Sequence, residues 1–217
     1  LAKPLARRFY RDVQVEPVAG GQFAVALDGR PIKPPAKHPL LLPTRAAAEA
    51  VAAEWAAQIA TIDPARMPMT RFANTAIDAV AQAMDAVAAD IVAYAGRDLI
   101  CYRAEGPDKL LLRQVAQWNP VLSWFETVFG ARFESVAGIM PIVQSEASLA
   151  RIAAAIAPHD PFRLTALHTM TTLTGSALLA LAHAKGLLTT DAAWDAAHIG
   201  EAYQIEQWGP DEEASRR

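Results

Sequence analysis

Two groups of carboxylic acids are the first residues in this chain that could do chemistry. Asp98, Glu105 and Asp108 lie close together in the sequence, and a run of three acids occupies residues 211–213. A carboxyl group acts as a general acid or base when burial or a charged partner has moved its pKa. The run at 211–213 follows the Gly-Pro pair at 209–210, which is typical of a hydrated surface and predicts no catalysis there.

The internal group leaves an enzymatic interpretation open. A small hydrolase or isomerase could use Asp98 or Glu105 together with an arginine such as Arg71 or Arg103. Such an enzyme needs a deep pocket in which these groups converge around a carboxyl group of perturbed pKa. This is the alternative to a binding protein, and a structural subunit of a stable complex is a third interpretation.

Other chemistries lack their sequence signatures. The five histidines include no pair at the i,i+4 spacing of a helical zinc site, and one cysteine cannot form a cysteine-rich site. Neither GxGxxG nor GxxxxGK(S/T) occurs, so nucleotide binding is not indicated. Cys101 lies among apolar neighbours, which favours a buried structural thiol over a nucleophile. The sequence therefore predicts no catalytic residue, no metal and no cofactor.

Tryptophan is the remaining unusual feature, with five residues in the chain. Trp55 and Trp118 lie on apolar faces of expected helices and should support the core. Trp208 differs, because it ends a helix among polar residues and stands beside the acidic run. Glu201, Gln204 and Trp208 follow one another by three and four residues, so they can share one helical face. Tryptophan with polar neighbours is typical of a protein-binding surface.

Composition narrows the class of protein. The 217 residues are 53% hydrophobic and 20% charged, which suits one large or two small globular domains. A net charge of −3 gives no basic surface for nucleic acid, and no apolar run is long enough to span a bilayer. The basic start lacks the apolar segment of a secretory signal. We expect a soluble, intracellular protein with no membrane insertion.

The elements that must position these residues change in kind after residue 43. Alternating apolar residues, with Phe9 on the apolar face, predict strands over 9–16 and 22–27. Asp28-Gly29 predicts a two-residue hairpin turn into a partner strand over 30–33. The fold class is therefore α+β, with a small β-rich N-terminal domain at 1–43 and a larger, mainly α-helical domain at 44–217.

Helical periodicity dominates from Thr44 onward. Thr44 is the expected N-cap of a helix whose buried face carries Val51, Trp55 and Ile59. A longer helix is expected over 77–94, two shorter helices on either side of residues 119–120, and a last helix over 191–207. Gly209-Pro210 ends that last helix.

The order of several motifs resembles one known family, the assembly chaperones for the α subunit of the F-type ATP synthase head. The chain departs from it in small ways, such as an asparagine at 119 where an aspartate is more usual. The resemblance covers nearly the whole chain and is carried by these segments: RRFY at 7–10, LDGRPIKPP at 27–35, EWAAQ at 54–58, MPMTRFANTAID at 67–78, RDLICYRA at 97–104, QWNPVLSW at 117–124 and EAYQIEQWGPDEEASRR at 201–217.

The resemblance implies a function and a site. A member of this family binds the unassembled α subunit, prevents its aggregation and releases it to the β subunit, without a cofactor. It implies that Glu201 contacts the α subunit, with Gln204, Trp208 and Asp211 extending the contact. The internal alternative for Glu201 is an N–H or arginine partner within this chain. We expect a monomer in the bacterial cytoplasm, with the mitochondrial matrix as the alternative location.

Overall fold

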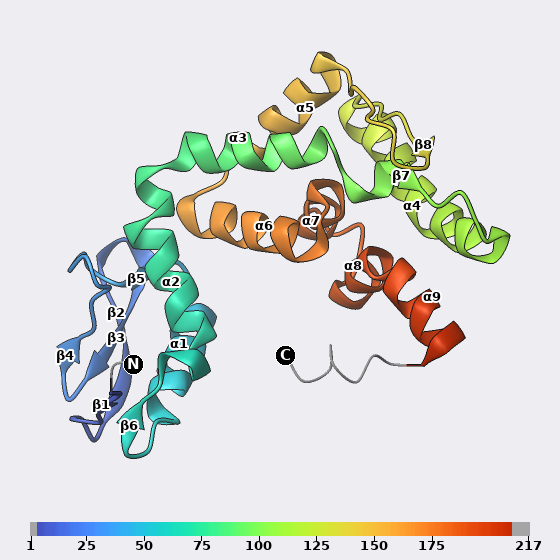
Figure 1. Ribbon diagram of the computed structural model, residues 1–217. Coiled ribbons are helices and arrows are strands. Elements are labelled where there is room, and N and C mark those ends of the chain that lie inside the picture. Colours follow the sequence, from blue (N-terminus) through green and yellow to red (C-terminus); the bar gives the residue numbers. More distant parts are fainter. Residues whose placement is uncertain (1–3, 210–217) are drawn as a thin grey trace. The chain divides into compact units, whose positions relative to one another are not determined.

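The computed structural model describes residues 4–209 and confirms the α+β class (Figure 1). Its contacts divide the chain into two compact units. The first unit is the chain up to Met84 together with Asp160–Thr165, and the second is Asp85–His159 together with the chain from Ala166 onward. The division into a β-rich domain at 1–43 and a helical domain at 44–217 stays a prediction, while the compact units group the first two helices with the strands.

An antiparallel sheet forms the base of the first unit. β3 (Phe23–Leu27) is central, with β2 (Val13–Pro17) on one side and β4 (Arg30–Pro31) and β5 (Leu41–Leu42) on the other. A separate pair joins β1 (Ala6–Arg7) to β6 (Thr61–Ile62). The predicted hairpin turn is confirmed.

That turn is possible because both of its residues adopt positive φ. Asp28 has φ 48° and Gly29 has φ 75°, as a type I′ turn requires. β4 is shorter than the expected partner strand, although the Ile32 N–H still donates to the Val25 carbonyl at 2.9 Å.

Helix α1 (Arg45–Ala56) packs on this sheet and on α2 (Pro68–Asp78). The predicted cap is confirmed, since Thr44 Oγ1 accepts a hydrogen bond from the Ala47 N–H at 3.1 Å. The core of the unit consists of apolar side chains from the strands and both helices: Tyr10, Val25, Leu27, Ile32, Leu40, Leu42, Ala48, Val51 and Ala73.

Two residues expected on buried faces of this unit are exposed. Phe9 precedes β2 rather than lying in it, and Ile59 lies beyond the end of α1. Their side chains are 73% and 84% exposed. The apolar periodicity therefore predicted both β2 and α1 to be longer than they are.

The second unit is mainly helical (Figure 1). One short parallel pair joins β7 (Tyr102–Arg103) to β8 (Val136–Ala137). α4 contacts α5, α7, α8 and α9, and α7 is buried over six consecutive residues. The helices are α3 (Met84–Ala95), α4 (Asp108–Phe129), α5 (Glu146–Ile156), most of α6 (Pro161–Thr174), α7 (Ala177–Ala184), α8 (Thr190–Ala197) and α9 (Ile199–Trp208). Within residues 4–209, no helix is long and apolar enough to cross a membrane.

The single helix expected over 77–94 is wrong. α2 ends at Asp78, a 3-10 turn occupies Val80–Gln82, and α3 begins at Met84. No glycine or proline marks this interruption, so the apolar pattern continues across it. The interruption lies where the first compact unit ends, which is a tertiary feature that local periodicity does not contain.

The two short helices expected around Pro120 are also wrong, because α4 is one helix with Pro120 inside it. Proline removes a helical N–H and usually bends or ends a helix. Here Trp118, Val121 and Phe125 are buried on the two turns that flank Pro120. Packing of these side chains stabilises the continuous helix despite the local cost.

Candidate protein-binding site

A groove of about 420 Å³ lies where α8 and α9 meet α4. We call it the C-terminal groove. It combines apolar, aromatic and charged side chains from these three helices: Arg113, Gln117, Trp194, Asp195, His198, Ile199, Glu201, Ala202 and Ile205.

A helix interruption at His198 shapes this groove. The single helix expected over 191–207 is wrong: His198, with φ −106° and ψ 18°, ends α8 and precedes α9. The Trp118 Nε1–H donates to the Ala196 carbonyl at 2.7 Å, which fixes α8 to α4. Ile199 and Tyr203 form the buried face of α9. The two short helices therefore pack on α4 separately and leave a depression between them.

Trp194 gives the groove a large exposed aromatic surface. Its ring stacks on the His198 imidazole with centroids 3.9 Å apart, and His198 Nδ1 lies 2.8 Å from the Trp194 carbonyl. These contacts hold the indole in place although it is 52% exposed. Ile205 adds a 44% exposed aliphatic side chain from α9. An ordered aromatic residue beside an aliphatic one is typical of a protein-binding surface.

The arginine of the groove is already paired. Arg113 donates two hydrogen bonds to Glu206, Nη1 to Oε1 at 2.7 Å and Nη2 to Oε2 at 2.6 Å. Lys109 Nζ lies 3.8 Å from the same carboxylate. Hydrogen bonding by Arg113 lowers the pKa of Glu206, and the same bond raises the pKa of Arg113. Glu206 thus joins α9 to α4 and neutralises the guanidinium.

Glu201 is left without such a partner. It lines the groove and is exposed, and within residues 4–209 it takes part in no hydrogen bond or ion pair. The alternative of an internal arginine or N–H partner therefore does not hold in the described part of the chain. Arg113, the arginine that lines the same groove, is bound to Glu206 instead.

The other residues predicted for the site are placed differently. Gln204 and Trp208 are exposed on α9, and Trp208 is 78% exposed, but neither lines the groove. Their spacing puts them on a face that continues from Glu201. Asp211 lies outside the described residues. The structure thus brings Glu201 together with Trp194 and Ile205, and leaves Gln204 and Trp208 on the adjoining surface.

Of the residues that line the groove, sequence reasoning selected only Glu201. Trp194 and His198 are four residues apart, a spacing that predicts contact on a helix and could have indicated their stacking. Arg113 had no such signal, because its partner Glu206 is 93 residues away in the sequence.

The residues of the enzymatic alternative do not converge in this way. Asp98 is fully buried and accepts hydrogen bonds from Ser176 Oγ at 2.5 Å, from the Leu178 N–H at 2.9 Å and from the Ile100 N–H at 3.2 Å. Burial raises the pKa of Asp98 to about 6, against the lowering effect of these bonds. The perturbed carboxyl group thus caps the start of α7 and does not line the groove.

Of the two arginines of that alternative, Arg103 is engaged elsewhere and Arg71 belongs to the other compact unit. Arg103 is 7% exposed, donates from Nη2 to Asn119 Oδ1 at 2.7 Å and lies over the Trp118 ring at 4.9 Å. Burial lowers the pKa of Arg103. Arg71 belongs to the first unit, whereas Asp98 and Glu105 belong to the second.

Cys101 is buried, as the sequence predicted. Burial, together with the nearby charge of Asp98, raises the pKa of its thiol to about 12, so it is protonated at neutral pH. Within residues 4–209, no group of three or more histidine, cysteine, aspartate or glutamate side chains could hold a metal ion.

Comparison with known proteins defines the class to which this fold and groove belong. The sequence model of the ATP12 chaperone protein matches residues 7–126, which is more than half of the chain. The chain belongs to the ATP12 chaperone family.

Solved structures support the same class. The chain is similar to the Atu1473 protein of Agrobacterium tumefaciens, with 48% identity, 100% of this chain and 81% of that chain covered, and a TM-score of 0.92. It is also similar to Atp12 from Paracoccus denitrificans, with 44% identity, 97% and 90% covered, and a TM-score of 0.89. This protein is thus a chaperone of ATP synthase assembly, with an ATP synthase subunit as its partner.

Proposed function

We propose that the partner is the unassembled α subunit of F-type ATP synthase. The protein binds this subunit, prevents its aggregation and releases it when the β subunit arrives. The observation that carries the proposal is the C-terminal groove, in which the unpaired Glu201 carboxylate stands beside the exposed Trp194 and Ile205.

The chemistry of the groove suits a temporary protein contact. A subunit of an obligate ring exposes apolar interface surface before assembly, and such surface self-associates. Trp194 and Ile205 offer apolar area to cover it, while Glu201 can accept hydrogen bonds from a basic or N–H group of the partner. An interface of roughly 800 Å² per partner gives specificity while the true neighbour can still displace the chaperone.

The decisive experiment measures light scattering of the purified α subunit with and without a stoichiometric amount of this protein. We expect suppression for the natural sequence and none for Glu201→Lys, because the substitution reverses the charge of one of the two unpaired carboxylates that line the groove, Glu201 and Asp195. Since Glu201 is exposed, the melting temperature should stay within about 2–4 °C, the shift expected from roughly 1 kcal/mol.

A matched control separates the site from a general effect of charge. Glu126→Lys makes the same charge change at an exposed position of α4 that does not line the groove, and should suppress aggregation normally. An unrelated aggregating protein should not be protected. Equal suppression of every protein, or full activity of Glu201→Lys with the α subunit, would contradict the proposed partner or the proposed contact.

We also propose that the chaperone covers part of the α surface that the β subunit later uses. Adding β should then release the chaperone, which size-exclusion chromatography can follow. A stable complex of all three proteins would contradict this overlap. The bacterial cytoplasm remains the expected location, supported by relatives of known structure from two bacteria. A monomer also remains our expectation.

A further inference from the structure

The first unit carries a second groove, of about 460 Å³, which we call the N-terminal groove. It has an aromatic side, an aliphatic side from the β3–β4 hairpin, and charged residues at the hairpin. The lining residues are Phe9, Tyr10, Leu27, Asp28, Arg30, Pro31, Ile32, Lys33 and Trp55.

The aromatic side is held by contacts within the unit. Tyr10 is buried, and its hydroxyl donates to the Trp55 carbonyl at 2.7 Å. The Tyr10 ring makes edge contacts with Phe9 and with Trp55, at centroid distances of 5.4 and 5.7 Å. Phe9 nevertheless remains 73% exposed, so the groove displays an ordered aromatic side chain to solvent.

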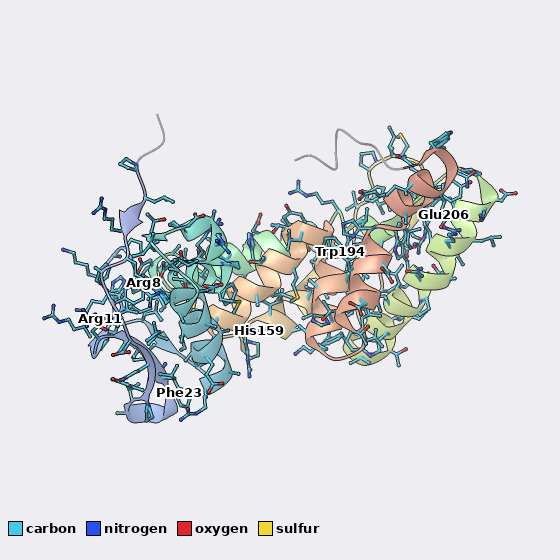
Figure 2. The ribbon with its side chains drawn as sticks, turned by 90° about the horizontal axis from the view of Figure 1, so that it is seen from below. Arg8, Arg11, Phe23, His159, Trp194 and Glu206 are labelled. Atoms are coloured by element: carbon cyan, nitrogen blue, oxygen red, sulfur yellow. The ribbon has the colours of Figure 1, made fainter. Side chains whose placement is uncertain are left out.

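Arg8 fixes the segment that carries Phe9. Its guanidinium donates to the carbonyls of Tyr10 at 3.1 Å, Gln58 at 2.6 Å and Arg11 at 3.0 Å. It also lies over the Tyr10 ring at 4.7 Å. Figure 2 shows Arg8 against the body of the unit and Arg11 directed away from it. The shape of the groove is therefore formed before a partner binds.

The charge of the groove is positive and unpaired. Asp28, the one acid that lines it, accepts hydrogen bonds from the N–H groups of Arg11 at 3.0 Å and Asp12 at 2.8 Å. These hydrogen bonds lower the pKa of Asp28, and the bond from the Asp12 N–H has the larger effect. Within residues 4–209, Arg30 and Lys33 take part in no ion pair. The Asp28 carboxylate is thus hydrogen-bonded to the backbone, while Arg30 and Lys33 are available to a ligand.

The charge of the surrounding unit has the same sign. In its described residues the first unit has ten lysines and arginines against eight aspartates and glutamates. The described second unit has seven against twelve. The N-terminal groove therefore lies on the more basic part of an acidic protein, which favours an acidic ligand.

The hairpin also indicates how that ligand is held. A β-strand partner at the edge would need outward backbone N–H groups, and Pro31 of β4 has none. Recognition by side chains is favoured instead, with an apolar residue against Phe9 and Ile32 and a carboxylate near Arg30 and Lys33.

We propose that the N-terminal groove binds a segment of the client subunit in which an apolar side chain is flanked by aspartate or glutamate. The inference rests on the proposed function, because it assigns a second contact to the same client. It adds a contact that is chemically opposite to that of the C-terminal groove, where the unpaired group is an acid.

The test places a photoreactive side chain in the groove of the full chain. Phe9→p-benzoylphenylalanine is irradiated with the unassembled α subunit, and the crosslinked peptide is identified by mass spectrometry. We expect a crosslink to an α segment with an acidic residue next to an apolar one. In the Arg30→Glu/Lys33→Glu background the crosslink should disappear, and affinity for the α subunit should fall at least about tenfold at physiological salt.

A matched double variant controls for net charge. Lys37→Glu/Arg66→Glu makes the same charge change at exposed positions of the first unit outside the groove, and should keep both the crosslink and an affinity within about twofold. Both double variants should melt near the natural protein, because all four side chains are exposed.

The outcomes separate the two proposals. If the natural protein forms no complex with the α subunit, the proposed function fails and this inference with it. Suppose the complex forms but the photoreactive residue at position 9 crosslinks only to a second copy of this chain, or only to residues 210–217 of the same chain. The assignment of the client subunit as the ligand of this groove is then wrong. A client crosslink that survives in the Arg30→Glu/Lys33→Glu background would contradict recognition of an acidic segment.

Discussion

The two grooves both display aromatic side chains, but their charged groups are arranged in opposite ways. In the N-terminal groove backbone N–H groups donate to the Asp28 carboxylate, and Arg30 and Lys33 are unpaired. In the C-terminal groove Arg113 donates to Glu206, and Glu201 is unpaired. Backbone N–H groups thus hydrogen-bond the acid of the first groove, whereas a glutamate neutralises the arginine of the second. The charged groups left without a partner determine which ligand each groove favours.

Two arginines, the half-buried Arg8 of the first unit and the buried Arg103 of the second, differ in how far their hydrogen-bond donors are used. Arg8 of the first unit has three carbonyl acceptors and the face of Tyr10. Arg103 of the second unit has one side-chain acceptor and the face of Trp118, and its Nη1 has no hydrogen-bond partner among the described residues. A buried cation with an unused donor costs free energy, so a stronger acceptor beside Arg103 should stabilise the second unit.

The largest expected effect tests whether the aromatic residues of the two units have different roles. Trp55→Ala should lower the free energy of unfolding by about 3–5 kcal/mol, since it removes a large aromatic side chain packed on the core. Trp208→Ala should change it by less than about 0.5 kcal/mol, because the side chain is 78% exposed. Urea unfolding followed by circular dichroism measures both values.

Trp55→Phe makes this comparison sharper. The Trp55 indole N–H is buried without an acceptor among the described residues, so its loss removes no hydrogen bond. The phenyl variant should therefore cost much less than the alanine variant. Similar losses for Trp55→Ala and Trp208→Ala would show that the two residues do not differ as proposed.

The next effect concerns pH, which should act on the two units in opposite directions. Burial raises the pKa of Asp98 from 3.8 to about 6, so the folded second unit binds more protons than the unfolded chain between these values. The contribution of Asp98 is complete below pH 3.8 and decreases by up to about 3 kcal/mol as pH rises through 6. The lowered pKa of Asp28 instead gives the first unit a contribution that is lost as pH falls below 3.8.

Urea unfolding between pH 4 and pH 7 measures the effect of Asp98. In Asp98→Asn the side chain cannot ionise, so the decrease between pH 4 and 6 should disappear even though the variant is less stable throughout. If the natural protein and Asp98→Asn showed the same dependence on pH, Asp98 would not be its origin.

The smallest effect uses the difference between Arg8 and Arg103. Asn119→Asp places a carboxylate where Arg103 already donates, and should stabilise the protein by about 1 kcal/mol at pH 7, since bonds between charged groups are the stronger ones. Ser123→Asp, at an exposed position one turn further along α4, is the matched control and should have no such effect. A loss of stability in Asn119→Asp would mean that Arg103 does not lack a counter-charge.

Local sequence signals predicted the parts of the fold that local interactions create. Asp28-Gly29 formed the expected turn because positive φ at both residues is a requirement of the turn itself. Thr44 capped α1 for the same kind of reason. The interruption between α2 and α3 carried no such signal, and Pro120 carried a misleading one, because packing on residues distant in the sequence decided both.

The candidate site was predictable to a similar extent. Glu201 could be selected from the closing motif, and helical spacing placed Gln204 and Trp208 near it. The groove itself depends on the interruption at His198 and on the bond between Arg113 and Glu206, which are 93 residues apart in sequence. These features arise only when α4, α8 and α9 have packed, so no local pattern contained them.

The burial of Cys101 has a practical consequence for studying both grooves. The chain has one thiol, and it is buried with a pKa of about 12, so maleimide reagents should leave it unlabelled in the folded protein. A cysteine introduced at an exposed position such as Ile59 or Trp208 would then be the single labelled site. Fluorophores or spin labels attached there, with the natural Cys101 left in place, would report when the client subunit binds either groove and when it dissociates.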